Sequence, residues 1–199
     1  MSSFNPERQE NKIEGKIVVA LERISEAFRV LLWNESKSNA LSPIQVQILI
    51  FLLFHSGEKC KVSYLAAEFN MTKATISDSV KVLFLKKLIK KTGDELDTRS
   101  FTISLTAEGK KIAEQASSFT ASIEKPIGRL SDEQKKAMLD GLLKLIYELN
   151  RAGVITIQRM CFTCANYQFD KGTHYCKLLQ TTLAGGRLRI DCPEHEFIS

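Results

Sequence analysis

The sequence lacks any apolar run long enough to cross a lipid bilayer. Its longest such run, residues 48–54, is far shorter than the roughly 20 residues that a membrane helix needs. Residues 1–11 are polar and lack the apolar stretch of a secretory signal. We therefore expect a cytoplasmic protein with no membrane partner, in a compartment where cysteines are reduced rather than paired in disulfides.

A strong excess of charge of one sign is also missing from the chain as a whole. Its 199 residues carry 28 Lys and Arg against 23 Asp and Glu, and 44% of them are hydrophobic. This composition is ordinary for a folded globular protein, and no internal repeat or low-complexity tract interrupts it. Most of the net charge of +5 falls within residues 72–111, which hold nine basic and five acidic side chains. That segment is therefore the part that suits an anionic partner.

Two helices are expected near the N-terminus. The first carries one apolar stripe at steps of three and four residues, which is the spacing of one helical face. The second covers residues 44–55 after Ser42 and Pro43, which are typical of an N-cap and of a first helical position. It is apolar on most sides, so it should be the central core element. The stripe on the first helix consists of Ile13, Ile17, Leu21, Ile24, Phe28 and Leu31.

Two shorter helices, over residues 64–69 and 73–87, are separated by a turn, and this order predicts a helix-turn-helix. In the second helix Ile76, Val80 and Leu83 should face inward, because they recur at steps of four and three. The outer face should then consist of small polar and basic side chains. These are Thr72, Lys73, Thr75, Ser77, Asp78 and Lys81.

Two strands with a turn between them follow, at residues 88–92 and 100–105, and they predict a β-wing. Further helices are expected over residues 107–123 and from Ser131 to about residue 149, with an interruption at Pro126 and Gly128. The fold class is therefore mostly α with a small β-wing. We expect residues 1–153 to form a winged-helix domain and residues 154–199 a separate cysteine-rich tail.

The wing and the helix after it carry the most specific pattern. Asp97-Thr98-Arg99 precedes a strand that leads into Leu105-Thr106-Ala107-Glu108-Gly109. This passage resembles the MarR family of winged helix-turn-helix transcription regulators, which have an aspartate, one residue and an arginine before a strand ending in Leu-Thr-x-x-Gly. The resemblance covers roughly residues 10–150. The family commonly has glycine where Lys87 stands, so the turn into the wing is expected to differ in shape.

The resemblance implies a homodimer that binds double-stranded DNA and is not an enzyme. The first and last long helices would build the dimer, and residues 72–87 would be the recognition helix. Its exposed hydroxyls and lysines can donate to phosphates and base edges, and Arg99 would reach into a narrow minor groove. Family members often bind a small-molecule effector, but no residue here identifies one. The expected DNA-binding residues are Thr72, Lys73, Thr75, Ser77, Lys81 and Arg99.

Four of the five cysteines fall in the tail, where Cys161-x2-Cys164 is followed by Cys176 and Cys192. A segment this short usually needs a staple, and four thiolates suit a tetrahedral metal ion. Structural zinc is the first choice. An iron-sulfur cluster needs the same four ligands, and Cys192-Pro193 is typical of ferredoxins. His174 and His195 are spare, and we expect them to hydrogen-bond a thiolate rather than replace one.

The sequence thus favours a DNA-binding transcription regulator with a pseudo-palindromic operator and a metal site that stabilises or senses. The main alternative is a winged-helix scaffold with a zinc knuckle that binds protein partners. A scaffold of that kind would not require the basic face between Thr72 and Arg99. A catalytic zinc on His174, Cys176 and His195 is a weaker alternative, because the four cysteines already fill the coordination shell.

Overall fold

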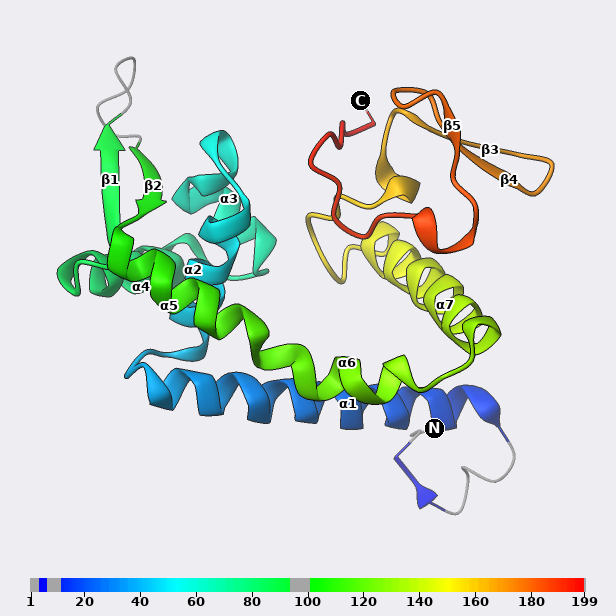
Figure 1. Ribbon diagram of the computed structural model, residues 1–199, viewed down its shortest axis with the longest axis horizontal. Helices are drawn as coiled ribbons and strands as arrows, with labels where there is room; N and C mark the ends of the chain where they lie inside the picture. Colours follow the sequence, from blue (N-terminus) through cyan, green and yellow to red (C-terminus); the bar gives the residue numbers. More distant parts are fainter. Residues whose placement is uncertain (1–3, 7–11, 94–100, 199) are drawn as a thin grey trace. The chain divides into compact units, whose positions relative to one another are not determined.

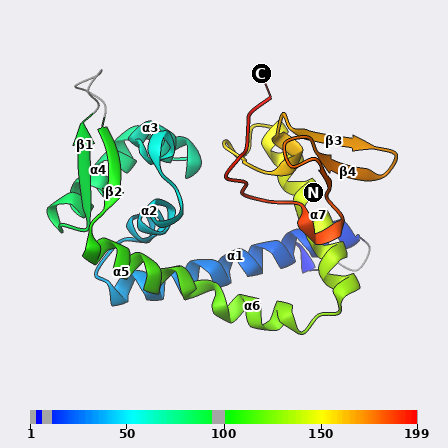
Figure 2. The same cartoon turned by 45° about the horizontal axis from the view of Figure 1, so that its top comes forward.

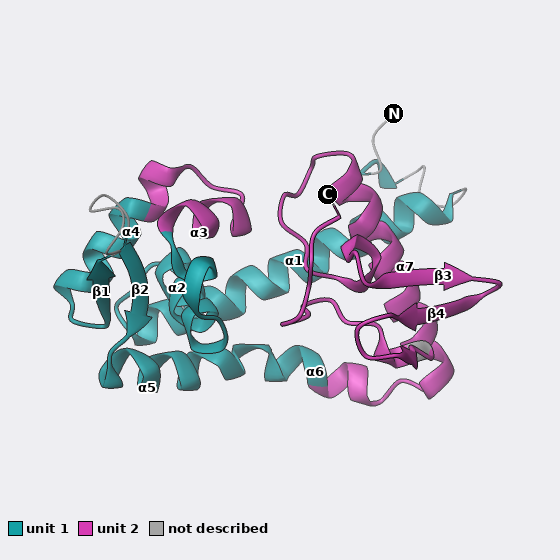
Figure 3. Ribbon diagram, turned by 90° about the horizontal axis from the view of Figure 1, so that it is seen from above, with its two compact units in different colours: residues 1–61, 77–124 teal, residues 62–76, 125–199 magenta. Residues whose placement is uncertain are grey.

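The computed structural model describes residues 4–6, 12–93 and 101–198 (Figure 1). Its chain forms two compact units, which Figure 3 colours separately. Unit 1 contains residues 1–61 and 77–124, and unit 2 contains residues 62–76 and 125–199. The expected boundary near residue 153, between a winged-helix domain and a cysteine-rich tail, stays a prediction.

Unit 1 begins with two helices that the sequence pattern predicted. Helix α1 is Ile13–Ser38 and helix α2 is Pro43–Phe54. The backbone N–H of Ser42 donates to the side-chain oxygen of Gln45 (3.0 Å), which begins α2 with proline at its first position. Val46, Ile48 and Leu49 of α2 are fully buried, so α2 is the central helix as expected.

The remaining elements of unit 1 pack around α2. The 3-10 helix η2 is Gly57–Cys60, and α5 is Ala107–Ala116. The wing consists of β1 (Ile89–Gly93) and β2 (Phe101–Leu105), which pair antiparallel with Ile89 opposite Leu105 (Figure 2). Residues 94–100 lie outside the described part, so the structure says nothing of Arg99.

The helix expected over residues 107–123 is divided. Helix α5 ends at Ala116, the 3-10 helix η3 covers Ser117–Thr120, and α6 covers Ala121–Gly128. The hydroxyls of Ser117 and Ser118 donate to the carbonyls of Glu114 and Gln115, three residues earlier (both 2.8 Å). Such local bonds compete with the regular helix ladder and account for the break. Pro126 lies inside α6, and the helix ends at Gly128.

A close backbone approach connects α5 to the wing. Thr106 caps α5 by accepting a hydrogen bond from the N–H of Gly109 (3.1 Å), and its hydroxyl donates to the carbonyl of Lys87 (2.9 Å). A Cβ atom at Gly109 would lie 1.9 Å from the carbonyl oxygen of Leu88. Glycine is therefore required where α5 crosses the start of the wing.

Unit 2 combines α3 (Val62–Glu68) with α7 (Asp132–Arg151) and the C-terminal tail. The tail forms a three-stranded antiparallel sheet of β3 (Tyr167–Asp170), β4 (Thr173–Cys176) and β5 (Thr181–Thr182), with 3-10 helices η4 (Cys161–Thr163) and η5 (Gly185–Arg187). Its core is shared with α7 and consists of Leu143, Met160, Leu183 and Leu188. The tail therefore packs on α7 as well as on its own side chains.

No described helix by itself has both the length and the apolar character of a membrane span. Helices α1 and α2 meet that criterion only as a pair, with an 89° bend between them.

Candidate nucleic-acid interface and cysteine cluster

Helix α4 (Lys73–Leu85) has one buried face and one exposed face. Ile76, Val80 and Leu83 are at most 1% exposed, as their spacing predicted. The backbone N–H of Thr75 donates to the hydroxyl of Thr72 (3.1 Å), so Thr72 caps the helix. Of the six side chains expected to contact DNA, Arg99 lies outside the described residues, and the other five are exposed: Thr72, Lys73, Thr75, Ser77 and Lys81.

The turn before α4 is built by local backbone bonds. The N–H of Met71 donates to the carbonyl of Ala66 (2.8 Å), and Asn70 has φ of 51°, in the left-handed region that asparagine tolerates. This turn ends α3 and directs the chain into α4 within four residues, Phe69 to Thr72. The order of α3, turn and α4 is that of a helix-turn-helix.

The turn from α4 into the wing keeps the geometry that glycine would adopt. Lys87 has φ of 59°, which is the left-handed conformation. The backbone at this position therefore does not show the expected change of shape. Lys87 adopts the left-handed backbone conformation, which is strained for a residue with a Cβ atom. On the wing, the ammonium of Lys91 lies 4.6 Å from the centre of the Phe101 ring and 5.1 Å from that of Phe84. These contacts hold a basic residue against the base of the wing.

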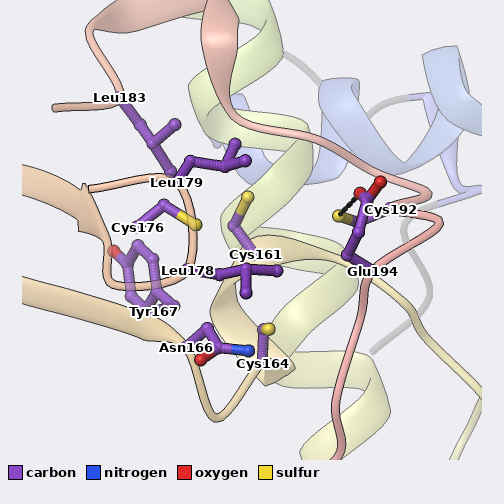
Figure 4. Close-up of a pocket in the computed structure, with 10 residues that line it drawn as sticks. All are labelled: Cys161, Cys164, Asn166, Tyr167, Cys176, Leu178, Leu179, Leu183, Cys192 and Glu194. Carbon is purple, nitrogen blue, oxygen red and sulfur yellow. Dashed lines mark hydrogen bonds between the residues drawn. The ribbon is translucent and has the colours of Figure 1, made fainter. Parts of the chain in front are cut away.

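The four tail cysteines line one pocket, although they are far apart in the sequence (Figure 4). Cys161 and Cys164 flank η4, Cys176 ends β4, and Cys192 lies in the last loop. The other lining residues include Leu178 and Leu183. Among the described residues, no three of the His, Cys, Asp and Glu side chains lie close enough together to hold a single metal ion.

Several N–H groups face the sulfur atoms of this pocket. The backbone N–H of Arg189 donates to Sγ of Cys161 (3.2 Å), and its guanidinium lies 3.7 Å from Sγ of Cys192. The side-chain amide nitrogen of Asn166 is buried and has no hydrogen-bond partner within the described part of the chain, and this residue also lines the pocket. The pocket therefore presents donors to sulfur atoms, together with one carboxylate, that of Glu194, which accepts from the Cys192 thiol (3.6 Å) and from the Arg189 guanidinium (3.2 Å).

Burial raises the pKa of the Cys161 thiol, and the other three cysteines raise it further through their charges. The N–H of Arg189 acts in the opposite direction. The main physical reason is that moving a thiolate out of water is unfavourable, and negative charge nearby adds to this cost. A cation bound in the pocket would oppose both effects by stabilising the thiolate form of Cys161.

The two spare histidines are engaged away from the sulfur atoms. Nδ1 of His174 is 2.7 Å from the hydroxyl of Tyr167, and Nε2 of His195 is 3.0 Å from the hydroxyl of Thr163. The expectation that they hydrogen-bond thiolates is therefore not what these contacts show. The contacts also place neither imidazole in a catalytic zinc site.

Cys60, the fifth cysteine, is separate from this cluster. It lies in η2, is 2% exposed, and donates from its thiol to the carbonyl of His55 (3.2 Å). Burial raises the pKa of its thiol, which disfavours the reactive thiolate. It is thus a buried structural thiol.

One buried network involves residues that the sequence did not single out. Arg159 is 6% exposed, and its guanidinium bonds Asp191, Glu68 and Tyr64, all within unit 2. Burial alone would lower the pKa of Arg159, but the hydrogen bonds and charges of Asp191 and Glu68 outweigh it and raise the pKa. The arginine is therefore held in its charged form by these partners, of which the Asp191 side chain is 46% exposed.

Comparisons with known proteins agree with the winged-helix architecture. Residues 41–100 match the model of the MarR family. The S. aureus MepR–DNA complex is 26% identical over 66% of this chain and 97% of that chain, with a TM-score of 0.59. S. aureus MepR in its DNA-binding conformation is 25% identical over 67% of this chain and 98% of that chain, also with a TM-score of 0.59.

A third structure, Streptococcus pneumoniae FabT in complex with DNA, shares the fold. It is 24% identical over 69% of this chain and 97% of that chain, with a TM-score of 0.58. No curated protein matched the sequence at a significant level. The family match and the solved structures agree on a winged-helix fold, and each structural alignment leaves about a third of this chain unmatched.

Proposed function

We propose that this MarR-type winged-helix protein is a transcription regulator that binds duplex DNA as a homodimer through α4 and the wing. The observation that carries the proposal is the two-sided character of α4. One face is fully buried, and the other exposes two lysines and three hydroxyl side chains at the start and middle of the helix. Lysines suit phosphates, and hydroxyls donate to phosphates or base edges.

The solved relatives support DNA as the partner, because MepR and FabT have been crystallised with it. By the family resemblance, Arg99 at the wing turn would enter the minor groove, where narrow A-tracts attract arginine. A protein-binding scaffold would not need this donor-rich face. DNA therefore remains the better supported partner.

Selection of bound sequences from a pool of random duplexes tests this function. In a two-fold dimer, the two recognition helices would meet successive major grooves about 34 Å apart. We expect the selected DNA to contain an inverted repeat with half-sites about one helical turn apart. Enrichment of no sequence, or of a single half-site without a repeat, would contradict the proposal.

The dimer is supported by apolar side chains that the protomer leaves uncovered. Ile13 of α1 is 69% exposed, and Ile17 and Trp33 are about half exposed. On α7 the tail covers Leu143, whereas Met138 and Leu145 stay exposed. A surface of this kind usually marks an interface between proteins.

Light scattering should therefore give the mass of two chains at micromolar concentration. Ile17→Glu together with Trp33→Glu should shift the protein toward one chain, because each substitution places a charge in the apolar interface. Lys111→Glu, an exposed change on α5 and outside the apolar surfaces of α1 and α7, is the control for added negative charge. A parent protein with the mass of a monomer would end the dimer proposal.

The proposal also includes a metal centre held by Cys161, Cys164, Cys176 and Cys192. Their convergence on one pocket supports it, as do the unpartnered amide of Asn166 and the N–H groups of Arg189. A single zinc ion would require the sulfur atoms to move closer together, since Zn–S bonds are about 2.3 Å. In a [4Fe–4S] cluster each thiolate binds a different iron, so a spacing too wide for one ion favours this alternative.

The chain's own contribution would be to supply four thiolates and to exclude water with apolar side chains. Either centre would join η4, β4 and the last loop, which are otherwise connected by a short sheet and a small core. Its first role would then be to stabilise the tail. A cluster would add redox sensitivity, which zinc lacks.

Metal analysis of cysteine variants tests the centre. Cys161→Ser and Cys176→Ser should each lose most of the metal and make residues 154–199 more sensitive to protease, while α1 to α5 remain folded. Cys60→Ser is the matched control, since Cys60 lies outside the pocket, and it should keep full metal. A brown protein containing iron and sulfide would indicate a cluster, and a colourless protein with stoichiometric zinc the simpler ion. Full metal in Cys176→Ser would remove that residue from the ligand set.

A further inference from the structure

The segments that carry Cys161 and Cys192 are bonded to each other by their backbones. The N–H of Cys192 donates to the carbonyl of Arg159 (2.9 Å), and the N–H of Cys161 donates to the carbonyl of Arg189 (3.1 Å). Arg159 is therefore fixed in place by the same backbone that positions two of the four cysteines. Any change that separates the cysteines would also displace Arg159.

The side chain of Arg159 connects this backbone to α3. On the tail side it makes two bonds to Asp191, from Nε (2.7 Å) and from Nη2 (3.0 Å). On the helix side its Nη1 donates to the hydroxyl of Tyr64 (2.9 Å), and its Nη2 donates to Glu68 (3.1 Å). Tyr64 and Glu68 are one helical turn apart and lie on the same face of α3. One guanidinium thus joins two carboxylates and a phenol in fixed geometry.

The tail contacts the end of α3 at two further points. The hydroxyl of Thr156 donates to the carbonyl of Ala67, and the amide of Asn70 donates to the carbonyl of Val154 (3.4 Å). Asn70 belongs to the turn that leads into α4. Contacts from residues 154–159 therefore reach the last turn of α3 and the turn of the helix-turn-helix itself.

The charges make this junction sensitive to the position of the arginine. The side chain of Glu68 is 17% exposed and that of Arg159 is 5% exposed, so both depend on their partners rather than on water. If Arg159 moves away, a carboxylate remains in a poorly hydrated position, which costs far more than a surface ion pair is worth. We therefore expect this junction, the contacts of Arg159 with Asp191, Tyr64 and Glu68, to form or to break as a unit.

We propose that Arg159 couples the state of the cysteine centre to the helix-turn-helix, as a positioning residue for DNA binding. With the centre filled, the backbone around Cys161 and Cys192 is fixed, and Arg159 holds the end of α3 and the turn before α4. With the centre empty, the junction loosens, and α4 loses part of its preorganisation for DNA. This inference rests on the proposed function and adds a regulatory role for the metal to it.

Two measurements on the full-length protein test the coupling. The first is hydrogen exchange of the peptide covering residues 62–70, before and after the metal is removed with a chelator. Exchange there should accelerate at least about fivefold, since coupling between sites typically lies between 5- and 150-fold. The second is the affinity for the selected duplex, which should fall on the order of tenfold on metal removal.

Arg159→Gln is the decisive variant. It should keep its metal, because the four thiols remain, but it should bind DNA as weakly with metal as the parent does without it. Arg151→Gln removes an exposed pair with Glu148 and a contact with the Tyr147 ring but leaves the contacts to α3 intact, so it is the matched control and should behave as the parent. If Arg159→Gln fails to fold, Glu68→Gln removes the same charge pair from the other side with little change of volume.

The outcomes separate the two proposals. A parent protein that binds no duplex refutes the proposed function, whereas the exchange of residues 62–70 still decides the coupling. The coupling is overturned if hydrogen exchange of residues 62–70 in the parent does not change when the metal is removed. It is also overturned if the DNA affinity of Arg159→Gln and of Glu68→Gln falls on metal removal as much as that of the parent. Tighter DNA binding by the metal-free parent also overturns it, because the junction would then oppose the DNA-binding arrangement. A protein purified without any metal refutes the centre and the coupling together.

Discussion

Replacing Gly109 with alanine is expected to lower the free energy of unfolding by about 3 kcal/mol or more. The added Cβ would lie 1.9 Å from the carbonyl oxygen of Leu88 and 2.8 Å from its carbonyl carbon, both backbone atoms. Leu88 has little freedom to retreat, since its carbonyl accepts hydrogen bonds from the N–H (3.0 Å) and the hydroxyl (3.2 Å) of Thr106. The better helix propensity of alanine, about 1 kcal/mol, does not offset this clash.

Gly141→Ala provides the matched control for this prediction. Gly141 is also helical, in α7, and a Cβ there would meet no described atom within 4 Å. The control should stabilise the protein by about 0.5 to 1 kcal/mol. Urea unfolding followed by circular dichroism measures both variants. A Gly109→Ala protein as stable as the parent would show that α5 and the wing do not pack as closely as the backbone distances require.

The second large effect is expected in DNA affinity. Lys73→Ala and Lys81→Ala should each weaken binding, because both side chains are exposed on the outer face of α4. Removal of a bond to a base costs about 1 to 3 kcal/mol, and each substitution acts twice in a dimer. Where the lysine binds bases, affinity should fall by about 2 to 6 kcal/mol. The same holds for Arg99→Ala, the wing residue outside the described part of the chain.

Local signals predicted the helices of the winged domain well. The hydrogen bonds of the three N-caps, Thr72–Thr75, Ser42–Gln45 and Ser131–Gln134, each span three residues along the chain. Such bonds depend little on the rest of the fold. The division of residues 107–123 into three elements was missed, although the adjacent Ser117 and Ser118 were a usable signal.

Long-range features were predicted only in part. The cysteine spacing predicted one shared metal site, and the four thiols do line one pocket, but among the described residues no three ligand side chains lie close enough to hold a single ion, so metal binding stays a prediction. The spacing did not predict how far apart the sulfur atoms lie, since that depends on the sheet of β3 to β5 and on the core shared with α7. The Arg159 junction left no local signal, because Glu68 is separated from Arg159 by 91 positions.

The part of the resemblance to MarR regulators that the structure explains best is the glycine of the Leu-Thr-x-x-Gly pattern, Gly109. The Leu-Thr-x-x-Gly pattern couples a capping threonine to a glycine that allows backbone contact with the wing. This contact explains why the pattern marks the passage from wing to helix. The same resemblance is less informative about Lys87, which adopts the conformation of the usual glycine.

The measurement that tests the central claim most directly is the salt dependence of duplex binding by the parent, Lys73→Ala, Lys81→Ala and a Lys125→Ala control. Fluorescence anisotropy gives the slope of log affinity against log salt concentration, which reports the number of phosphates that the protein neutralises. If α4 binds DNA, removing a lysine that binds phosphate should reduce the steepness by about 1 per phosphate, and removing a lysine that binds a base should lower affinity at every salt concentration. Lys125, an exposed residue of α6, should leave both quantities unchanged when it is replaced. Identical slopes and affinities for all four proteins would contradict the assignment of α4 as the DNA-binding helix.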